Sequence, residues 1–359
     1  MEKLQKAATL FLFLSLISFL ANLSTAAAAT SPAVFVFGDS TVDAGNNNFL
    51  PSDAPKANFP PYGVDYPRRI PTGRFGNGFL SVDFVAKAAG LRRSPPPFLS
   101  LSNAVQGRRG VNFASAGSGV FNTTGRYVVT MTQQIKDFST FAGNLAAAKG
   151  ARSAAVFLSK SLFYVSVGSN DLFAFSTVLI PGNSTQKDEI VAAVLPQFAD
   201  QLRSLYHLGA RKFAVVGTAQ LGCVPFVRRR FPGGACSPDL NDLPLRYKTA
   251  TRALLGHLAI ELEGFRYSFS DFFEIMSHIQ SDPQKYGFTE LAAACCGSGR
   301  LNAEGPCTPN STYCGNRNQY FFWDETHPTQ EVYRLAARLS FYGPRQFAYP
   351  VNIHSLLKS

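Results

Sequence analysis

Residues 35–46, "FVFGDSTVDAGN", contain a short apolar run, then a glycine, then a group of polar side chains. The run "AVFVF" at 33–37 has no polar residue, which is typical of a strand buried on both faces of a parallel sheet. Ligands of open α/β sheets bind beyond the carboxyl ends of the strands, so Ser40 is predicted to stand at such an edge. We expect Asp39 to shape the turn, and Asp43 and Asn46 to brace it.

The rest of the chain repeats this alternation of apolar runs and helical patterns. The runs "LFYVSV" (162–167) and "KFAVV" (212–216) also end in glycine, and "VNFASAG" (111–117) and "RYSFSDFF" (266–273) are weaker strand candidates. The order of elements predicts a three-layer α/β/α sandwich with a central parallel sheet. No repeat or linker divides the chain, so residues 30–359 are expected to form a single domain. Helices are expected at 82–91, 132–150, 188–209 with a kink at Pro196, 243–264 and 329–343.

The first 29 residues have the pattern of a secretory signal peptide. Lys3 and Lys6 precede an apolar run that extends to about Leu23, and the small residues 25–29 follow. An uncleaved anchor is the alternative, but the run is short for a comfortable membrane span. No second stretch of spanning length occurs. The mature protein is therefore expected to be secreted, with no integral membrane segment.

Sequons and cysteines fit an oxidising compartment. Six cysteines, an even number, all lie in the C-terminal half, which suggests disulfides. Cys223 is expected to pair with Cys236, and the adjacent residues Cys295 and Cys296 are expected to reach the two later cysteines in an order left open. No C-x-x-C pair supports the rival zinc site, and no metal is expected. The remaining candidates are Cys307 and Cys314 for disulfides, and Asn122, Asn183 and Asn310 for glycosylation.

The chain is basic, with a formal net charge of +11 that becomes +10 once the leader is removed. Its basic clusters are short: Arg68-Arg69, Arg92-Arg93, Arg108-Arg109 and residues 228–230. A nucleic-acid surface would need larger clusters with aromatic or groove-reading partners, so that function is not expected. The charge instead favours solubility and attraction to an anionic surface, such as an acidic wall polymer.

A nucleophilic Ser40 needs a base, and the chain has five histidines. His327 stands apart in "FFWDETHPTQE", where Asp324 lies three residues earlier and Pro328 disfavours helical geometry at the histidine. The Asp324 carboxylate could accept a hydrogen bond from Nδ1 and leave Nε2 facing Ser40. The alternative is that Asp324 only caps the next helix. The other histidines, His207, His257, His278 and His354, have no such context.

Other chemistry has weaker support in the sequence. No serine has the G-x-S-x-G context of the α/β-hydrolase nucleophile elbow, and there is no P-loop. The stretch "GSGVFN" at 117–122 lacks the last glycine of a dinucleotide fingerprint. No cofactor is therefore expected.

Four blocks in order resemble those of a known family. "FGDSTVDAGNN" (37–47), "GVNFASAG" (110–117), "GSND" (168–171) and "WDETHP" (323–328) resemble the sequence blocks of the GDSL esterase/lipase family, within the SGNH-hydrolase superfamily. The match is nearest to the secreted plant branch. The resemblance implies a flavodoxin-like SGNH-hydrolase fold and a carboxylic-ester hydrolase that acts on lipid or other acyl esters.

The resemblance also implies roles for single residues. Ser40 corresponds to the nucleophile, and Asp324 and His327 correspond to the family's D-x-x-H pair. The backbone N–H groups of Ser40 and Gly117 and the side chain of Asn170 correspond to the oxyanion hole.

Some of these assignments have rivals in the sequence. Gly119 lies two residues from Gly117 and competes with it, and Asn170 could instead close a turn with Asp171. Thr41 replaces the leucine of the family's signature. An acyltransferase that uses the same acyl-enzyme is an alternative function, and a non-catalytic binding protein on an esterase scaffold is an alternative of another class.

Overall fold

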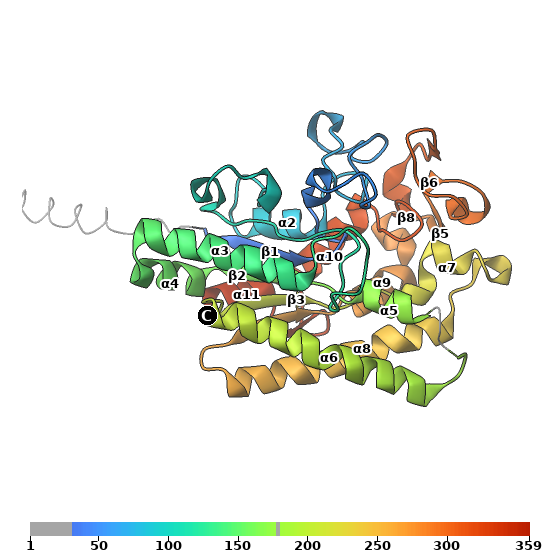
Figure 1. Ribbon diagram of the computed structural model, residues 1–359. Coiled ribbons are helices and arrows are strands. Elements are labelled where there is room, and N and C mark those ends of the chain that lie inside the picture. The colour runs from blue at the N-terminus through green and yellow to red at the C-terminus, as the bar shows by residue number, and fades with distance from the viewer. Residues whose placement is uncertain (1–30, 177–179) are drawn as a thin grey trace, which may run out of the picture. The chain divides into compact units, whose positions relative to one another are not determined.

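A computed structural model describes residues 31–176 and 180–359, and the predicted signal peptide lies outside this part. Residues 32–359 form one compact unit. A five-stranded sheet runs through it (Figure 1), with four parallel strands and an antiparallel fifth. The parallel strands are those predicted, whereas the antiparallel edge was not predicted. In spatial order the strands are β1 (Val34–Gly38), β2 (Leu162–Ser166), β3 (Lys212–Val216), β4 (Arg266–Ser270) and β9 (Ala348–Pro350).

The two weaker strand candidates need correction. The segment 111–117 runs beside β1 and exchanges backbone hydrogen bonds with it, but its regular pairing is limited to single bridges at Asn112. Counted as a rudimentary second strand, it completes the 2-1-3-4-5 order of flavodoxin-like sheets. The candidate at 266–273 ends earlier than expected, at Ser270, because the Asp271 carboxylate accepts a hydrogen bond from the Glu274 N–H and begins a helix.

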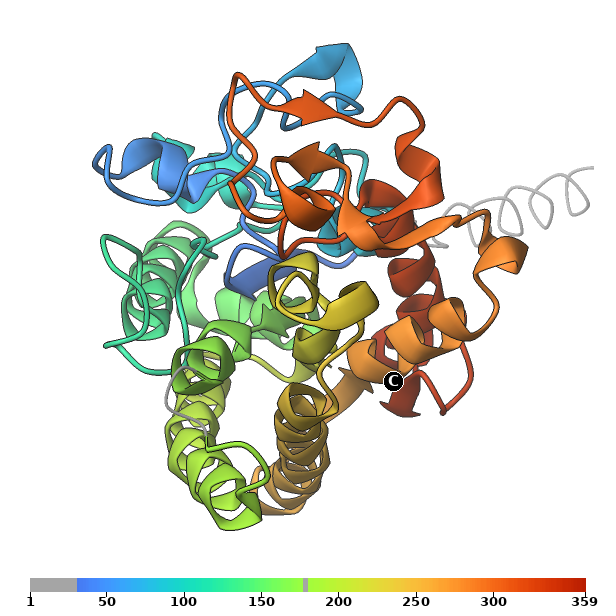
Figure 2. The ribbon, with the colours of Figure 1, turned by 90° about the vertical axis from the view of Figure 1, so that its right-hand side faces the viewer.

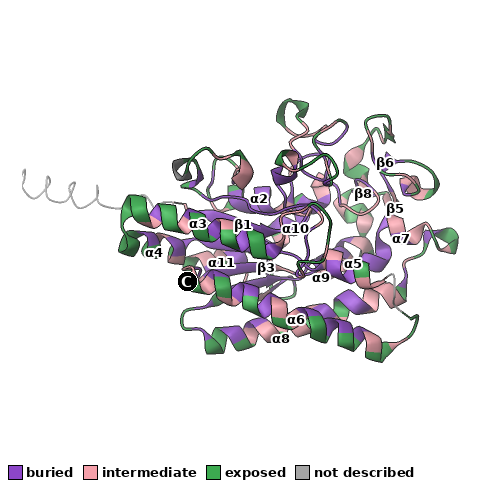
Figure 3. Ribbon diagram, viewed as in Figure 1, coloured by how far each residue is buried: buried purple, intermediate pink, exposed green. Residues whose placement is uncertain are grey.

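The alternating side chains of β1 show why helices cover both faces of the sheet. Phe35 and Phe37 pack in a core with α3, α4, α6 and α8, while Val34 and Val36 pack in another with α2, α10 and α11. Figure 2 shows the two helical layers, and Figure 3 shows their buried faces toward the sheet and exposed faces outward. The predicted three-layer sandwich is confirmed. The covering helices are α2 (Ser81–Ala88), α3 (Met131–Lys149), α4 (Ala151–Lys160), α6 (Ser184–His207), α8 (Pro238–Glu261), α10 (Gln330–Tyr342) and α11 (Ile353–Lys358).

Smaller elements gather at the carboxyl ends of the parallel strands and beyond. Helices α5 (Ser169–Ser176), α7 (Pro225–Arg228) and α9 (Phe272–Ser281) lie there, as do the strand pairs β5 (Glu290–Ala294) with β8 (Tyr320–Phe322) and β6 (Cys296–Gly297) with β7 (Thr312–Tyr313). Short 3-10 helices occupy Asn46–Phe49, Pro67–Arg69, Phe98–Ser100, Ala104–Gly107, Leu221–Cys223, Pro232–Gly234, Pro283–Tyr286, Arg300–Asn302 and Arg317–Gln319.

The five predicted helices are present within a few residues of their expected bounds. Gly150, with φ of 82°, ends α3 as expected, but a further helix, α4, begins directly after it. Pro196 lies inside α6, and the kink expected there stays a prediction. Most of the unpredicted helices are short. They were not predicted because so few turns give too little hydrophobic periodicity to recognise.

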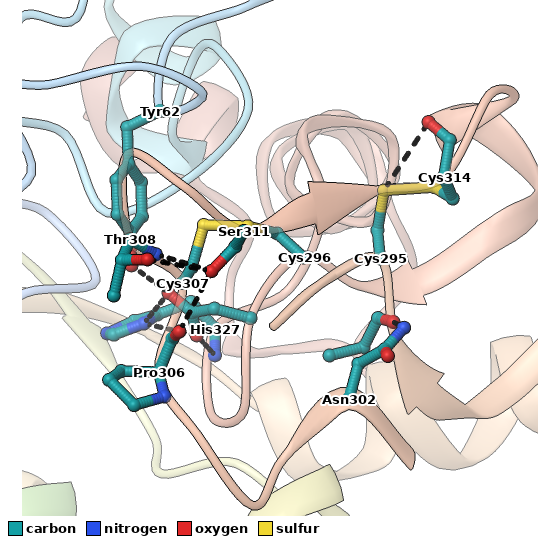
Figure 4. Close-up of a disulfide and its surroundings, with 12 residues drawn as sticks. Tyr62, Cys295, Cys296, Asn302, Pro306, Cys307, Thr308, Ser311, Cys314 and His327 are labelled. Carbon is teal, nitrogen blue, oxygen red and sulfur yellow. Dashed lines mark hydrogen bonds and ion pairs between the residues drawn. A yellow bond between two sulfur atoms is a disulfide. The ribbon is translucent and has the colours of Figure 1, made fainter. Parts of the chain in front are cut away.

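All six cysteines are in disulfides. Cys223 is bonded to Cys236, as predicted. The pairing left open by the sequence is Cys295 with Cys314 and Cys296 with Cys307 (Figure 4). Both of these bridges lie in the segment that packs against β8 and the loop after it.

Candidate active site

The first part of the site is the turn at residues 38–47, called the Ser40 turn below. Strand β1 ends at Gly38, where a Cβ atom would lie 1.9 Å from the Ser166 carbonyl oxygen, so only glycine permits this approach to β2. The Gln134 side chain donates to the Gly38 carbonyl and accepts from its N–H, both at 2.9 Å. Ser40 follows at the sheet edge and is partly exposed.

Two buried carboxylates shape the Ser40 turn, as predicted. Asp39 accepts hydrogen bonds from the Thr41 N–H at 2.9 Å and from its hydroxyl at 2.7 Å. Asp43 accepts from the N–H groups of Gly45 and Asn46, each at 2.7 Å, and of Ala116 at 3.0 Å. Burial raises the pKa of Asp39 and that of Asp43 to about 6, although these hydrogen bonds act in the opposite direction.

Asn46 joins the Ser40 turn to the next sequence block. Its side-chain amide donates to the carbonyl groups of Asn112 and Ala114, each at 2.8 Å, and accepts from the Leu99 N–H at 3.0 Å. The position of Ser40 relative to Gly117 is therefore fixed by side-chain bonds between two distant segments.

The second part of the site is the loop at residues 323–328, called the His327 loop below. The His327 Nε2 atom lies 2.8 Å from the Ser40 Oγ atom. Its Nδ1 atom lies 2.8 Å and 2.9 Å from the two carboxylate oxygens of Asp324. Asp324 Oδ1 also accepts from the N–H groups of Thr326 and His327, so the carboxylate orders its own loop as well as the imidazole.

The electrostatics of this pair oppose the effect of burial. Burial alone would raise the pKa of Asp324, but His327 and the backbone hydrogen bonds lower it below its usual range. Burial would lower the pKa of His327, yet Asp324, followed by Glu325 and Asp39, raises it above its usual range. Asp324 is thus held as an anion, and His327 is a stronger base than a free imidazole.

Tyr62 is part of this arrangement and was missed by the sequence analysis. Its buried hydroxyl donates to Asp324 Oδ2 at 2.9 Å, and its ring packs against Phe75 and Trp323. Phe75 also lies against the imidazole of His327, with ring centroids 5.2 Å apart. Figure 4 shows Tyr62 and His327 beside the disulfide of Cys307. Nothing in the "FPPYG" context of residues 59–63 signals this contact, because it depends on how a long loop folds back.

Two of the backbone N–H groups at the site that have no acceptor among the described residues are important for its chemistry. They belong to Ser40 and Gly117, whereas the N–H groups of their neighbours Thr41, Ala116 and Ser118 are all bonded within the protein. Both residues line one pocket with Asn170, so the free donors face the same space.

The structure separates Gly117 from its rival Gly119. A Cβ atom on Gly119 would lie 2.4 Å from the Asp171 carboxylate, so this glycine packs away from the pocket. Asp171 accepts from the N–H groups of Val120 and Phe121 and braces the loop after Gly117. Asn170 uses one amide hydrogen on the Ser118 carbonyl at 2.9 Å.

The pocket beside Ser40 has a volume of about 210 Å³. Ser40, His327, Gly117 and Asn170 all line it, and most of its remaining wall is apolar. The apolar side chains come from loops and helices that follow different strands, as expected at the carboxyl edge of an open sheet. They are Pro55, Phe75, Ala116, Phe173, Ala219, Leu221, Val224, Phe272 and Pro328.

The remaining histidines lie elsewhere, on helices away from this pocket. His207 and His257 are exposed on α6 and α8, and His278 and His354 belong to α9 and α11. Within residues 31–176 and 180–359, no group of three or more His, Cys, Asp or Glu side chains is arranged to hold a metal ion.

A serine, a histidine and an aspartate at the carboxyl edge of a parallel sheet, beside an apolar pocket, define the class of serine hydrolases on open α/β sheets. Comparison with known families gives the narrower identity. The model of the GDSL-like lipase/acylhydrolase family matches residues 34–339, and the chain belongs to this family. The resemblance noted in the sequence is thereby confirmed.

Relatives in Arabidopsis thaliana support the same conclusion. GDSL esterase/lipase At1g71691 is 38% identical over 333 residues, which cover 90% of this chain and 85% of the relative. GDSL esterase/lipase 7 is 34% identical over 347 residues, covering 91% and 92%. A GDSL-like lipase structure from Parabacteroides merdae covers 86% of this chain and 93% of its own at 12% identity, with a TM-score of 0.37, a likeness that says nothing about the site. The protein is a serine esterase/lipase that acts on carboxylic ester bonds.

Proposed function

We propose that the protein hydrolyses acyl esters through an acyl-enzyme on Ser40, with His327 as general base and Asp324 as its orienting carboxylate. The observation that carries this proposal is the unbroken chain of contacts from Asp324 through His327 to Ser40, next to two unpartnered backbone N–H groups. The same three types of side chain, in these relative positions, serve acyl transfer on several unrelated folds.

The proposed reaction begins when Ser40 Oγ attacks the acyl carbonyl carbon and its proton moves to His327 Nε2. The carbonyl oxygen becomes negative and is stabilised by the N–H groups of Ser40 and Gly117 and by the remaining amide hydrogen of Asn170. The tetrahedral intermediate then collapses, and the C–O bond to the alcohol breaks. His327 gives its proton to the leaving alcohol, and the acyl-enzyme remains.

Water completes the cycle in the proposed mechanism. His327 accepts a proton from the water molecule whose oxygen attacks the acyl carbon. The second tetrahedral intermediate then collapses: the bond from the acyl carbon to Ser40 Oγ breaks, His327 returns its proton to Ser40 Oγ, and the carboxylic acid is released. Asp324 stays ionised throughout and stabilises the imidazolium that forms in each half of the reaction. Its lowered pKa supports this role.

The pocket supports a lipid-like or other apolar acyl group as the substrate. Its wall is mostly apolar, but its volume of about 210 Å³ is below the ~300–1,000 Å³ typical of pockets that enclose a whole drug-sized ligand. We therefore propose that it holds the part of the acyl chain nearest the ester, while the rest of a long substrate lies outside.

We further propose that residues 1–29 are removed and that the mature domain, residues 30–359, is secreted and glycosylated. All six cysteines are in disulfides, which persist in oxidising compartments. Asn122 and Asn310 are exposed, and Asn183 is partly exposed at the start of α6. In the part of the chain that the structure describes, no helix is both long and apolar enough to cross a membrane.

The test is the variant Ser40→Ala in the purified mature protein, assayed with a panel of esters from acetyl to long-chain acyl. We expect kcat to fall by at least a thousandfold, because loss of a triad member typically costs orders of magnitude. A fluorescent phosphonate should label the wild type and not the variant. The exposed Ser52→Ala is the matched control and should keep both properties. A folded Ser40→Ala protein with more than about a tenth of wild-type kcat contradicts the assignment.

A further inference from the structure

A second hollow lies at the opposite end of β1 from Ser40. It has a volume of about 670 Å³ and shares no lining residue with the pocket at Ser40. The Val34 N–H, at the amino end of β1, donates to the Arg109 carbonyl, which places the hollow at that end of the sheet. In Figure 1 the teal segment that carries it lies on the far side of α2 from α5 and α9.

Two pairs of arginines line this hollow: Arg92 with Arg93, and Arg108 with Arg109. All four side chains are exposed, and no acidic residue is part of the lining. Across residues 31–176 and 180–359, no carboxylate lies within ion-pair distance of any of them, and none makes a side-chain hydrogen bond or stacks on a ring. Four positive charges therefore face one concave surface without compensation.

Several other arginines of the chain have partners within the protein, which gives a basis for comparison with the four at the hollow. Arg74 and Arg317 are paired with carboxylates, and Arg228 donates to two carbonyl groups. Arg229 and Arg230 both lie over the ring of Phe226, with guanidinium carbons 4.7 Å and 4.9 Å from its centroid. The pair Arg229-Arg230 therefore serves as a control within the same chain. It also has two adjacent positive charges, but both are already in contact with a ring of the protein.

We propose that the arginine-lined hollow binds an acidic polysaccharide, a polymer of uronic acids. A guanidinium group is planar and binds a carboxylate through two parallel N–H bonds, so each arginine pair suits successive carboxylates of one chain. The volume of about 670 Å³ exceeds what a single small anion fills and lies within the ~300–1,000 Å³ of pockets that hold drug-sized ligands, which is room for part of a polymer chain. Ser94 and Gln106 add neutral polar groups for sugar hydroxyls.

The lining disfavours two other polyanionic ligands, nucleic acid and a layer of anionic lipid headgroups. No aromatic residue lines the hollow, so unpaired nucleic-acid bases would have no platform to stack on. Among the side chains described between residues 91 and 110, none is a large exposed hydrophobic that could insert into a lipid headgroup layer. A hydrophilic, carboxylate-bearing polymer fits both the charge and the lack of large exposed apolar side chains among the described residues of this segment.

Binding at this position has a consequence for the enzyme. The hollow and the Ser40 pocket lie at opposite ends of the same strand, so a polymer held at the arginines leaves the Ser40 pocket open to substrate. The hollow would then keep the esterase at an acidic matrix. This inference stands on the arginines alone and does not depend on the proposed ester chemistry.

The experiment measures the dissociation constant of the full mature protein for polygalacturonate by titration calorimetry at low salt. Three double variants each remove two charges: Arg92→Gln/Arg93→Gln, Arg108→Gln/Arg109→Gln, and, as the matched control, Arg229→Gln/Arg230→Gln. We expect each of the first two to weaken binding at least about tenfold and the control less than about twofold, because only the former face the hollow. Equal losses in all three, or no loss in the first two, would overturn the proposal.

Further measurements distinguish the effect of positive charge from that of bidentate guanidinium geometry. They also distinguish the acidic polysaccharide from other polyanions. Arg108→Lys/Arg109→Lys keeps the charge but loses the bidentate geometry, and we expect an affinity between those of the wild type and the glutamine variant. Fully methyl-esterified polygalacturonate should not bind, since it has no carboxylates. Tighter binding to phosphatidylserine vesicles or to single-stranded DNA than to polygalacturonate would also overturn the proposal. Thermal melting checks that each variant is folded, as expected for the exposed arginines of the hollow.

Discussion

The Ser40 turn and the His327 loop meet at one hydrogen bond, but they are held in place by different means. Asp43 and Asn46 hold the Ser40 turn through buried hydrogen bonds, and no cysteine lies in the first 222 residues. The His327 loop is held by a cross-linked segment, because the Cys296 N–H donates to the Trp323 carbonyl at 2.7 Å and Cys296 is bonded to Cys307. The comparison shows that the proposed catalytic geometry is held on the Ser40 side by buried hydrogen bonds and on the His327 side by a disulfide-linked segment.

The largest effect is expected from removing the centre of the polar network with Asp43→Ala. The buried N–H groups of Gly45, Asn46 and Ala116 would lose their acceptor. An unsatisfied buried donor costs about 1–3 kcal/mol, so we expect the free energy of unfolding to fall by roughly 3–5 kcal/mol. Chemical denaturation at pH 7 measures this. The exposed Asp53→Ala is the control and should change it by less than about 0.5 kcal/mol. Equal stability of the two variants would show that the carboxylate does not hold the turn.

The cross-linked side is tested by removing one disulfide at a time. Cys223→Ala/Cys236→Ala opens a loop with a sequence separation of 13, and Cys296→Ala/Cys307→Ala one of 11. The similar loops predict similar losses of stability, about 3 kcal/mol each.

The two disulfide variants should differ in their kinetics. Cys296 contacts the His327 loop, so we expect its variant to lower kcat about tenfold, or ~1.4 kcal/mol. Cys223 adjoins Val224 in the pocket wall, so its variant should mainly raise KM. Steady-state kinetics below the melting temperature decides. If kcat falls to the same extent in both, the disulfide at Cys296 has no special role in holding His327.

These experiments also separate what the sequence could predict from what it could not. The continuous apolar runs predict the parallel strands. Ser40 could be predicted as a site residue because it lies two residues after the end of one of these strands. Asp324 and His327 lie three residues apart, so their contact is local. Tyr62 reaches Asp324 across 262 residues through a loop that no periodicity describes. Gln134 reaches Gly38 across 96 residues from α3, a helix that periodicity predicts without indicating where it docks. The antiparallel strand β9 has only three residues, too few for an alternating pattern.

Tyr62→Phe tests the hydrogen bond from the Tyr62 hydroxyl to Asp324 in the His327 loop. It removes a side-chain hydroxyl bond to Asp324 but keeps the ring that packs on Trp323. We expect kcat to fall about tenfold, roughly 1.4 kcal/mol, with KM nearly unchanged, because the carboxylate that orients His327 loses a fixed partner. The control is Tyr164→Phe, which removes another buried hydroxyl bond, to Ser81, away from the site. An equal fall in kcat for the control would assign the effect to general loosening of the core.

The smallest expected effect is a shift in the pH profile, and it comes from a charge in the His327 loop that makes no contact with Ser40. Burial would lower the pKa of His327, but Asp324 and then Glu325 raise it above its usual range. Since the proposed base must be neutral, kcat/KM should rise with pH through a value above about 6.5. Glu325→Gln removes one of the carboxylates that favour the imidazolium.

The rising limb of Glu325→Gln should therefore move to lower pH, by less than about one unit, because a unit corresponds to about 1.4 kcal/mol and Asp324 remains. Glu304→Gln removes an exposed carboxylate of the cross-linked segment that is not among the groups raising the pKa of His327, and its limb should coincide with that of the wild type. Profiles of kcat/KM between about pH 5 and pH 8, measured at constant ionic strength, make the comparison. A rising limb that stays in place or moves to higher pH in Glu325→Gln would contradict this prediction. It would mean that the charge of Glu325 does not raise the pKa of the proposed base.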